Sequence, residues 1–148
     1  EHFLCIFQRQ EVHQNLDRLN YDLDLICKDV FEYQPKNHFD IILLDPPCTA
    51  TGTIGKNPDL QFLNPLDKLE ELLDIQQKML KRCASWLQDD GYIIYSVCSL
   101  LKEEGEYQIS RFLKKNKEKR NKTKKNYLQS IHFCFAFIRS KSFKFIVH

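Results

Sequence analysis

The clearest pattern along the chain is a pair of short, nearly unbroken apolar runs that each end in polar residues. The first run, DIILLD at 40–45, lies between a polar loop and two prolines, and the second, YIIYSV at 92–97, follows Asp-Asp-Gly. Runs of this length without strict alternation are typical of strands buried on both faces of a parallel sheet. We therefore predict two neighbouring buried strands, preceded by a shorter strand at 22–27.

Helical periodicity fills the segments between these strands. Apolar residues recur at helical spacing in three segments, 7–20, 65–88 and 103–114. Asn64 and Pro65 suit the start of the middle helix, and Asp-Asp-Gly at 89–91 is predicted to stop it. This order predicts an α/β fold with right-handed crossovers and a mostly parallel sheet flanked by helices. Two later segments, 131–138 and 142–147, are expected to pair antiparallel at the sheet edge.

The composition argues against membrane-spanning and secreted classes of protein. The 148 residues suffice for one domain, and 43% hydrophobic with 28% charged residues is typical of a globular chain. No stretch approaches the roughly 20 apolar residues of a membrane span, and no basic-then-apolar start indicates a signal peptide. We expect a cytoplasmic monomer with free thiols, and, because the chain begins at Glu1 within an apolar segment, a fragment.

Six cysteines are the candidate chemistry of the chain, and none forms a C-x-x-C pair. This spacing argues against a zinc knuckle or a thioredoxin-type site, and we expect no metal ion. Four cysteines lie in apolar strands or on apolar helix faces and are predicted to be small core residues. These are Cys5, Cys27, Cys83 and Cys134.

Cys48 and Cys98 differ from the other four because proline, serine and threonine flank them at strand ends. Asp45-Pro46-Pro47-Cys48 directly follows the first buried run, and Tyr95-Ser96-Val97-Cys98-Ser99 ends the second. Proline fixes the backbone, so Asp45 and Cys48 would keep a set distance. Since the carboxyl ends of parallel strands meet at one rim, where such sheets carry their chemistry, we expect both cysteines there.

The two motifs resemble the signature segments of the bacterial ribosomal RNA cytosine-5 methyltransferases of the RsmB/NOP/Sun family. FDIILLDPPCTATGTIGKNPDLQF at 39–62 is similar to the first signature, and IIYSVCSLLKEEGEYQI at 93–109 to the second. The resemblance runs from about Gln8 to Ile109 in the family's order and is weaker at 133–136. It implies a Rossmann-like class I methyltransferase fold, here truncated at the N-terminus.

The resemblance implies transfer of a methyl group from S-adenosylmethionine to carbon 5 of cytosine in RNA, with ribosomal RNA the expected substrate and transfer RNA the alternative. Carbon 5 is a poor nucleophile, and a thiolate that adds to carbon 6 makes it enamine-like. Cys98 matches the family's nucleophile, and Cys48 matches the second cysteine, which helps to release the product. Asp45 matches the acidic residue beside the cofactor's reactive end and the target base, where a held acid supports charge at ring nitrogen 3.

Further matches concern the cofactor and the RNA. Asp29 matches the acidic residue near the cofactor's adenine, although a turn-capping aspartate is the alternative. Lys56, Asn57, Pro58 and Asp59 match a loop of the family, and the resemblance implies that this loop faces RNA. The family's glycine-rich motif, which holds the methionine end of the cofactor, is expected before Glu1, and no acid lies at 3–5, where the family binds ribose.

The resemblance and the composition together divide the chain into three parts. We expect a partial methyltransferase catalytic domain at 1–113, a Lys-rich linker or insertion at 114–128, and a C-terminal β segment at 129–148 that completes the sheet. Within the linker, KKNKEKRNKTKK at 114–125 holds eight Lys or Arg and one Glu. Such a run is usually a solvated segment, and contact with RNA phosphates is the functional alternative.

Two other functions remain open. Asp-Pro-Pro at a strand end also occurs in methyltransferases that act on exocyclic amino groups of nucleic acids, but those place an aromatic residue where Cys48 lies. The other alternative is a degenerate, non-catalytic fragment that only binds RNA, since the glycine-rich motif is absent from these residues.

Overall fold

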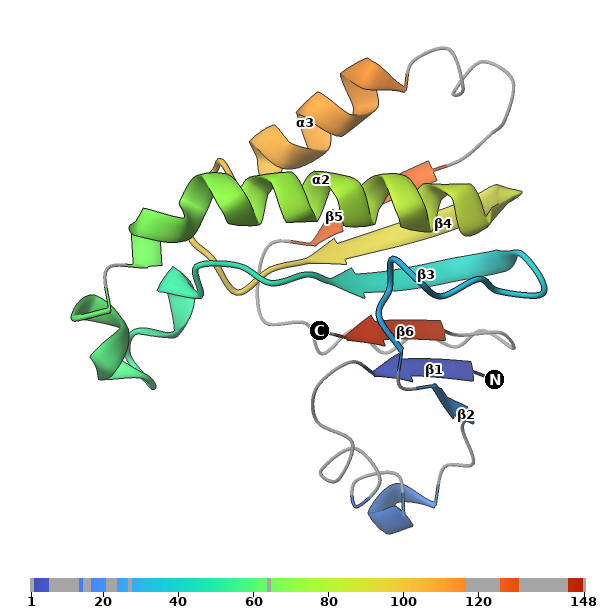
Figure 1. Cartoon of the computed structure of the whole chain (residues 1–148), viewed down its shortest axis with the longest axis horizontal. Helices are drawn as coiled ribbons and strands as arrows, with labels where there is room; N and C mark the ends of the chain where they lie inside the picture. The colour runs from blue at the N-terminus through green and yellow to red at the C-terminus, as the bar shows by residue number, and fades with distance from the viewer. Residues whose placement is uncertain are drawn as a thin grey trace.

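A computed structural model of the chain describes residues 2–5, 14, 17–20, 24–26, 28–63, 65–116, 126–130 and 144–147. Its centre is a six-stranded sheet in the order β2-β1-β6-β3-β4-β5, in which every pair of neighbours is parallel (Figure 1). The strands are β1 (His2–Cys5), β2 (Asp24–Ile26), β3 (Phe39–Asp45), β4 (Leu87–Ser96), β5 (Asn126–Ser130) and β6 (Lys144–Val147). The prediction of an α/β fold with a mostly parallel sheet is confirmed.

The two apolar runs form β3 and β4, which are adjacent in the sheet as predicted. Ile42 and Leu44 of β3 are fully buried, and Ile41 and Leu43, on the other face of the strand, are half-buried, so both faces are covered. Ile93 and Tyr95 of β4 are equally buried. An unbroken apolar run places apolar side chains on both faces of the strand, which suits an interior position.

The C-terminal strand β6 contradicts the prediction of an antiparallel pair at the sheet edge. β6 lies between β1 and β3 and runs parallel to both, with Leu4 opposite Ile146 and Leu44 opposite the same residue. The sheet edge next to β4 is instead formed by β5, which pairs with β4 and begins at Asn126, inside the predicted linker. A β-rich pattern identifies a strand, but the partner is chosen by long-range pairing that the pattern does not encode.

Two helices accompany the central strands. A single turn of 3-10 helix, Pro65–Lys68, leads into α2 (Leu69–Trp86), and α3 is Glu106–Lys115. Figure 1 shows α2 running along β3 and β4 in front of the sheet with α3 beside it, and α2 contacts all three elements. The buried face of α2 includes Leu73, Met79, Leu80, Cys83 and Trp86.

The middle helix ends earlier than Asp-Asp-Gly at 89–91 predicted, because Leu87 already belongs to β4. Leu87 is buried and lies opposite Phe39, and the register then shifts so that Tyr92 is opposite Ile41. Gly91 lies within this irregularity, where a Cβ would meet the carbonyl oxygens of Phe39 and Asp40 at 3.0 Å. The sequence 88–91 therefore forms a bulge in the strand rather than the end of a helix.

Several predictions fall on other parts of the chain. The helix at 7–20, the cap at Asn64, the segment 131–138 and most of the Lys-rich run lie largely or wholly outside the described residues. The three-part division of the chain stays a prediction. Among the described residues, no helix is both long enough and apolar enough to cross a membrane.

Candidate active site

The structure brings Cys48 and Cys98 together at the rim where β3 and β4 end. Their sulfur atoms are 3.4 Å apart, although 50 residues separate them along the chain. β3 and β4 are in parallel register, with Leu44 opposite Tyr95, so the loops that follow the two strands leave the sheet side by side. Cys98 is exposed and Cys48 is half-buried, which makes the Cys98 sulfur the more accessible of the two.

Backbone and hydroxyl hydrogen bonds join the two cysteine loops. The Gly52 amide donates to the Cys98 carbonyl at 2.9 Å, and the Leu100 amide donates to Thr51 Oγ1 at 2.9 Å. The Ser99 hydroxyl lies 3.1 Å from that of Thr49 and 3.2 Å from that of Thr51. All four contacts join residues far apart in sequence, so the relative position of the loops depends on the assembled fold.

The loop after Cys48 also contains a strained residue. Ala50 has φ 54° and ψ 23°, in the left-handed region that a non-glycine residue enters at a cost of about 1–3 kcal/mol. This conformation begins a turn of 3-10 helix at Thr51–Thr53, which brings the Thr51 hydroxyl and the Gly52 amide toward the Cys98 loop. The strained backbone of Ala50 therefore lies where the two cysteine loops meet.

The two thiols differ in their acidity. The hydrogen bond from the Cys48 thiol stabilises the Cys98 thiolate and lowers the pKa of Cys98 to about 7, against the opposing effects of partial burial and of Asp45. The pKa of Cys48 is raised, first by the same hydrogen bond and then by burial. The two sulfurs titrate as a pair, and Cys98 loses its proton first. Cys98 is therefore the stronger nucleophile near neutral pH.

Asp45, the last residue of β3, lies close enough for its charge to act on Cys98 and on Tyr95. Burial raises the pKa of the Asp45 carboxyl above its ordinary value. A carboxyl group in this environment holds a proton more readily than an exposed one and can donate it to a substrate. The rim therefore combines a reactive thiolate, a neutral thiol and a carboxyl group with raised proton affinity.

A model of the family described as 16S rRNA methyltransferase RsmB/F matches residues 7–137, which include both cysteine loops. The chain belongs to the RsmB/F methyltransferase family. The match covers most of the 148 residues, and it confirms the resemblance that the two signature segments indicated.

Curated relatives of this RsmB/F chain carry the name ribosomal RNA small subunit methyltransferase B. The protein from Shewanella oneidensis is 40% identical over 107 residues, which cover 70% of this chain and 25% of the relative. The one from Pasteurella multocida is 34% identical over 115 residues, covering 72% of this chain and 26% of the relative. The chain thus spans about a quarter of the length of the curated relatives that it matches.

A solved structure supports the fold independently. The crystal structure of PH0851 superposes with a TM-score of 0.70 and 29% sequence identity, covering 76% of this chain and 27% of that chain. Together with the family match, this confirms the Rossmann-like methyltransferase fold of the RsmB/F chain.

The other predicted site residues are exposed and lie in two segments outside the sulfur pair. Asp29 is exposed, and its Oδ1 accepts a hydrogen bond from the Phe31 amide at 2.8 Å, which is the turn-capping contact of the alternative interpretation. Lys56, Asn57 and Asp59 are exposed in the short turns that follow the Cys48 loop. None of the contacts described for these residues reaches either cysteine.

A buried polar cluster that the sequence did not predict lies directly behind Cys48. Glu104, Gln76 and Gln108 are fully buried in this RsmB/F chain, and Thr49 and Ser99 are nearly so. A signal for Gln76 existed, because it interrupts an otherwise apolar face of α2 between Leu73 and Met79. Glu104 gave no such signal, since a glutamate before a helix is expected on the surface.

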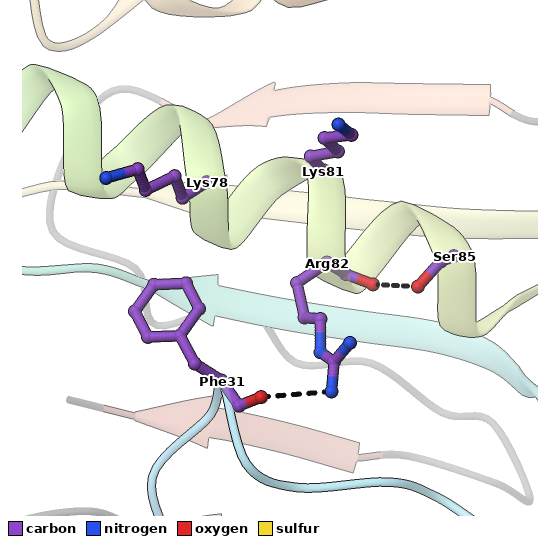
Figure 2. Close-up of a pocket in the computed structure, with 5 residues that line it drawn as sticks. All are labelled: Phe31, Lys78, Lys81, Arg82 and Ser85. Atoms are coloured by element: carbon purple, nitrogen blue, oxygen red, sulfur yellow. Dashed lines mark hydrogen bonds between the residues drawn. The ribbon is translucent and has the colours of Figure 1, made fainter.

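An open pocket of about 330 Å³ lies elsewhere, between α2 and the loop after β2, and contains none of the predicted site residues. Figure 2 shows it lined by Phe31, Lys78, Lys81, Arg82 and Ser85. Arg82 donates hydrogen bonds to the carbonyls of Phe31 and Tyr33 at 3.0 and 3.1 Å, and these bonds hold the loop against α2. Within the described ranges, no group of His, Cys, Asp and Glu is arranged to hold a metal ion.

Proposed function

We propose that the protein containing this chain methylates carbon 5 of a cytosine in ribosomal RNA, using S-adenosylmethionine and a covalent adduct through Cys98. The observation that carries the proposal is the 3.4 Å contact between two sulfurs of unequal acidity. A single activated thiol would suffice for attack, but a second thiol in contact with it provides for release. Ribosomal RNA is the substrate named for the curated relatives and would place the protein in the cytoplasm.

The first step is the addition of the Cys98 thiolate to carbon 6 of the cytosine. A sulfur–carbon bond forms, and the electrons of the ring double bond move toward carbon 5 and nitrogen 3. Asp45, whose carboxyl pKa is raised by burial, donates a proton or a hydrogen bond to nitrogen 3. Carbon 5 then has enough electron density to take a methyl cation equivalent.

Asp29 and Asp45 would hold the cofactor, Asp29 near its adenine and Asp45 near its reactive end. Asp29 follows β2 and Asp45 ends β3, both at the carboxyl rim of the sheet, where open α/β folds bind their ligands. The Asp29 carboxylate accepts the Phe31 amide but, as a carboxylate, takes several hydrogen bonds and can also accept from an adenosine group. S-adenosylmethionine, when bound, would supply the electrophilic methyl group and would leave as S-adenosylhomocysteine.

Cys48 completes the cycle by removing the proton from carbon 5. In the free protein its pKa is raised first by its hydrogen bond to Cys98. When Cys98 becomes a neutral thioether in the adduct, that cause disappears, burial remains as the cause that raises the pKa, and Cys48 ionises more readily than in the free protein. The Cys48 thiolate then takes the proton, the carbon 5–carbon 6 double bond forms again, and the bond from Cys98 to carbon 6 breaks. Any proton that Asp45 gave to nitrogen 3 returns to Asp45. The order of steps therefore follows from the coupling of the two thiols.

The exposed turn after the Cys48 loop is proposed to contact the RNA. Lys56 would approach a phosphate, and Asn57 and Asp59 offer acceptors for base amino groups. The turn is joined to the site through Thr53, whose carbonyl accepts the amides of Lys56 and Asn57 at 2.8 Å.

Three variants of the full-length protein, incubated with small-subunit ribosomal RNA and cofactor, test the proposal. Cys48→Ala should accumulate a denaturant-resistant protein–RNA adduct, because Cys98 still attacks but release is blocked. Cys98→Ala should yield neither adduct nor 5-methylcytosine. Cys83→Ala is the matched control, since Cys83 is buried on α2 away from the rim, and it should retain both activities.

Three results would contradict the proposal. An adduct that persists in Cys98→Ala would show that the roles of the cysteines are reversed. Methyl groups found on exocyclic nitrogen would support the amino-group alternative. A wild-type protein that binds RNA but forms neither adduct nor 5-methylcytosine would support the non-catalytic alternative.

A further inference from the structure

We propose that Glu104 and Gln76 are positioning residues that fix the backbone on both sides of Cys48 and so hold its sulfur against Cys98. Both side chains are buried, and neither is one of the proposed reacting groups. It deepens the proposed function and rests on it only where release of the RNA is concerned.

Glu104 fixes the residue that follows Cys48. Its carboxylate accepts the backbone amide of Thr49 at 3.0 Å and also the Thr49 hydroxyl. A third donor, Gln76 Nε2, reaches the same carboxylate at 2.9 Å. The Glu104 side chain has no solvent exposure, so without these donors its burial would be strongly unfavourable. The carboxylate is therefore committed to Thr49 and Gln76.

Gln76 fixes the residue that precedes Cys48. Its Nε2 donates to the Pro47 carbonyl at 2.9 Å as well as to Glu104. Its other amide atom, Oε1, accepts from Gln108 Nε2 at 3.0 Å, and Gln108 Nε2 also donates to the Leu73 carbonyl at 2.7 Å. Since Gln108 engages the oxygen, the amide nitrogen of Gln76 must face Pro47 and Glu104.

The two contacts hold Cys48 from both sides along the chain. The carbonyl before it and the amide after it are each bound to a side chain from α2 or from the turn before α3. The turn itself is anchored to the sheet, because the buried Tyr95 hydroxyl donates to the Glu104 carbonyl at 2.9 Å. Tyr95 belongs to β4, the strand that leads to Cys98, so both cysteines are positioned from one set of contacts.

A role in packing alone does not account for this arrangement. An apolar side chain at position 76 would continue the buried face formed by Leu73, Met79 and Leu80. Replacing a buried polar network by well-packed apolar groups is often neutral or stabilising. The polar pair has a consequence that apolar packing would lack, which is a fixed position for the Cys48 sulfur.

Glu104→Gln is the direct variant, because it keeps the shape but presents an amide to three donors. At least one donor would then face another donor, and the Cys48 loop should shift. Glu103→Gln is the matched control, since the same chemical change is made one residue away on an exposed side chain. Gln76→Met is the second variant, chosen because methionine suits the apolar face of α2 and should preserve folding.

The first measurement needs neither RNA nor cofactor. The full-length protein is treated with diamide, a thiol oxidant, and formation of the Cys48–Cys98 disulfide is followed over time by peptide mapping. Misplacing a reacting group by about 1 Å slows a reaction by up to roughly a hundredfold. We expect Glu104→Gln and Gln76→Met to slow disulfide formation about tenfold or more, and Glu103→Gln to leave it unchanged. Unchanged rates in both folded variants would overturn the inference.

The second measurement follows the protein–RNA adduct and the methylated product together. A displaced Cys48 should impair release more than attack, so Glu104→Gln should accumulate adduct as Cys48→Ala does. Equal loss of adduct and product would indicate a general structural defect and would contradict the positioning role. If the wild type forms neither adduct nor product, the proposed function fails, while the disulfide rates still decide the inference.

Discussion

The Gly52 amide donates a hydrogen bond to the Cys98 carbonyl oxygen, with 2.9 Å between nitrogen and oxygen, and a Cβ at position 52 would lie 2.7 Å from that oxygen. Carbon and oxygen atoms that are not bonded do not approach so closely. The contact therefore depends on the absence of a side chain. It draws the chain after Cys48 against the carbonyl of the other cysteine, so glycine at this position helps to set the distance between the two sulfurs.

Replacing Gly52 by alanine should separate the two cysteine loops. The backbone carbonyl cannot move aside as a flexible side chain would, and overpacking of this kind costs about 1–3 kcal/mol. We expect a lower free energy of unfolding by that amount in urea titrations and slower oxidation of the cysteine pair. Gly55→Ala is the control, because a Cβ there meets nothing within 4 Å. Equal stability of both variants would show that the loops adapt without loss.

The reactivity of Cys98 should depend on pH through the hydrogen bond from Cys48. Below about pH 7 the Cys98 thiol is protonated and unreactive, and above it the thiolate predominates. The rate of alkylation by iodoacetamide, followed by mass spectrometry of the Cys98 peptide, should therefore be half-maximal near pH 7. In Cys48→Ala the donor that stabilises the thiolate is lost, so the midpoint should move to higher pH.

Cys83 provides the internal control for this titration. It is buried on α2, and burial raises its pKa, so it should not react in the folded protein. A midpoint that is the same with and without Cys48 would mean that the sulfur contact does not determine the acidity of Cys98.

Hydrogen peroxide should convert the cysteine pair to a disulfide and reversibly stop the proposed methylation. The Cys98 thiolate attacks one peroxide oxygen, the oxygen–oxygen bond breaks, and sulfenic acid and water result after protonation. Cys48 then attacks the sulfenic sulfur and a second water leaves. The sulfurs need to approach by roughly 1.4 Å, because a disulfide bond is about 2.05 Å long and they start 3.4 Å apart.

Dithiothreitol should restore activity to the oxidised wild type. Without Cys48 the sulfenic acid has no neighbouring thiol and should proceed to sulfinic acid, which dithiothreitol does not reduce. Peptide masses distinguish a disulfide from a sulfinic acid. Recovery of the free Cys98 thiol that is as complete in Cys48→Ala as in the wild type would show that Cys48 does not protect Cys98.

Arg82 should contribute to stability through the loop that it binds. Its guanidinium donates to two backbone carbonyls and lies 5.6 Å from the centre of the Trp86 ring. Hydrogen bonds to charged groups contribute about 1.5–3 kcal/mol, but the buried Arg82 Nε has no hydrogen-bond partner, which offsets part of the gain. Arg82→Met should lower the free energy of unfolding by about 1–2 kcal/mol. Lys81→Met, on the exposed side of the same helix, should change it by less than about 0.5 kcal/mol.

The sequence predicted the position of the cysteines because two local signals coincide. An unbroken apolar run marks an interior parallel strand, and proline or serine after it marks the strand's end. Since parallel strands end at one rim, Cys48 and Cys98 were expected there, and their sulfurs are in contact. The same reasoning failed for the segment at 88–91, where acidic residues and glycine form a bulge of β4.

Only the tertiary structure revealed what surrounds the pair. The bonds from Glu104 and Gln76 to the Cys48 loop join residues 29 and 55 positions apart. Their formation depends on how α2 and the turn before α3 approach the end of β3, which no local pattern specifies. The position of β6 between β1 and β3 was also decided only by the tertiary structure, because a β-rich pattern indicates a strand but does not specify its neighbours in the sheet.

The sequence by itself thus determined which residues stand at strand ends and which chemical groups they carry, because periodicity and proline act within a few residues. The unequal acidity of Cys48 and Cys98, the raised proton affinity of Asp45 and the burial of Glu104 were decided by the tertiary structure. These properties depend on distance and on exclusion of water, which arise only when segments far apart in the chain are assembled.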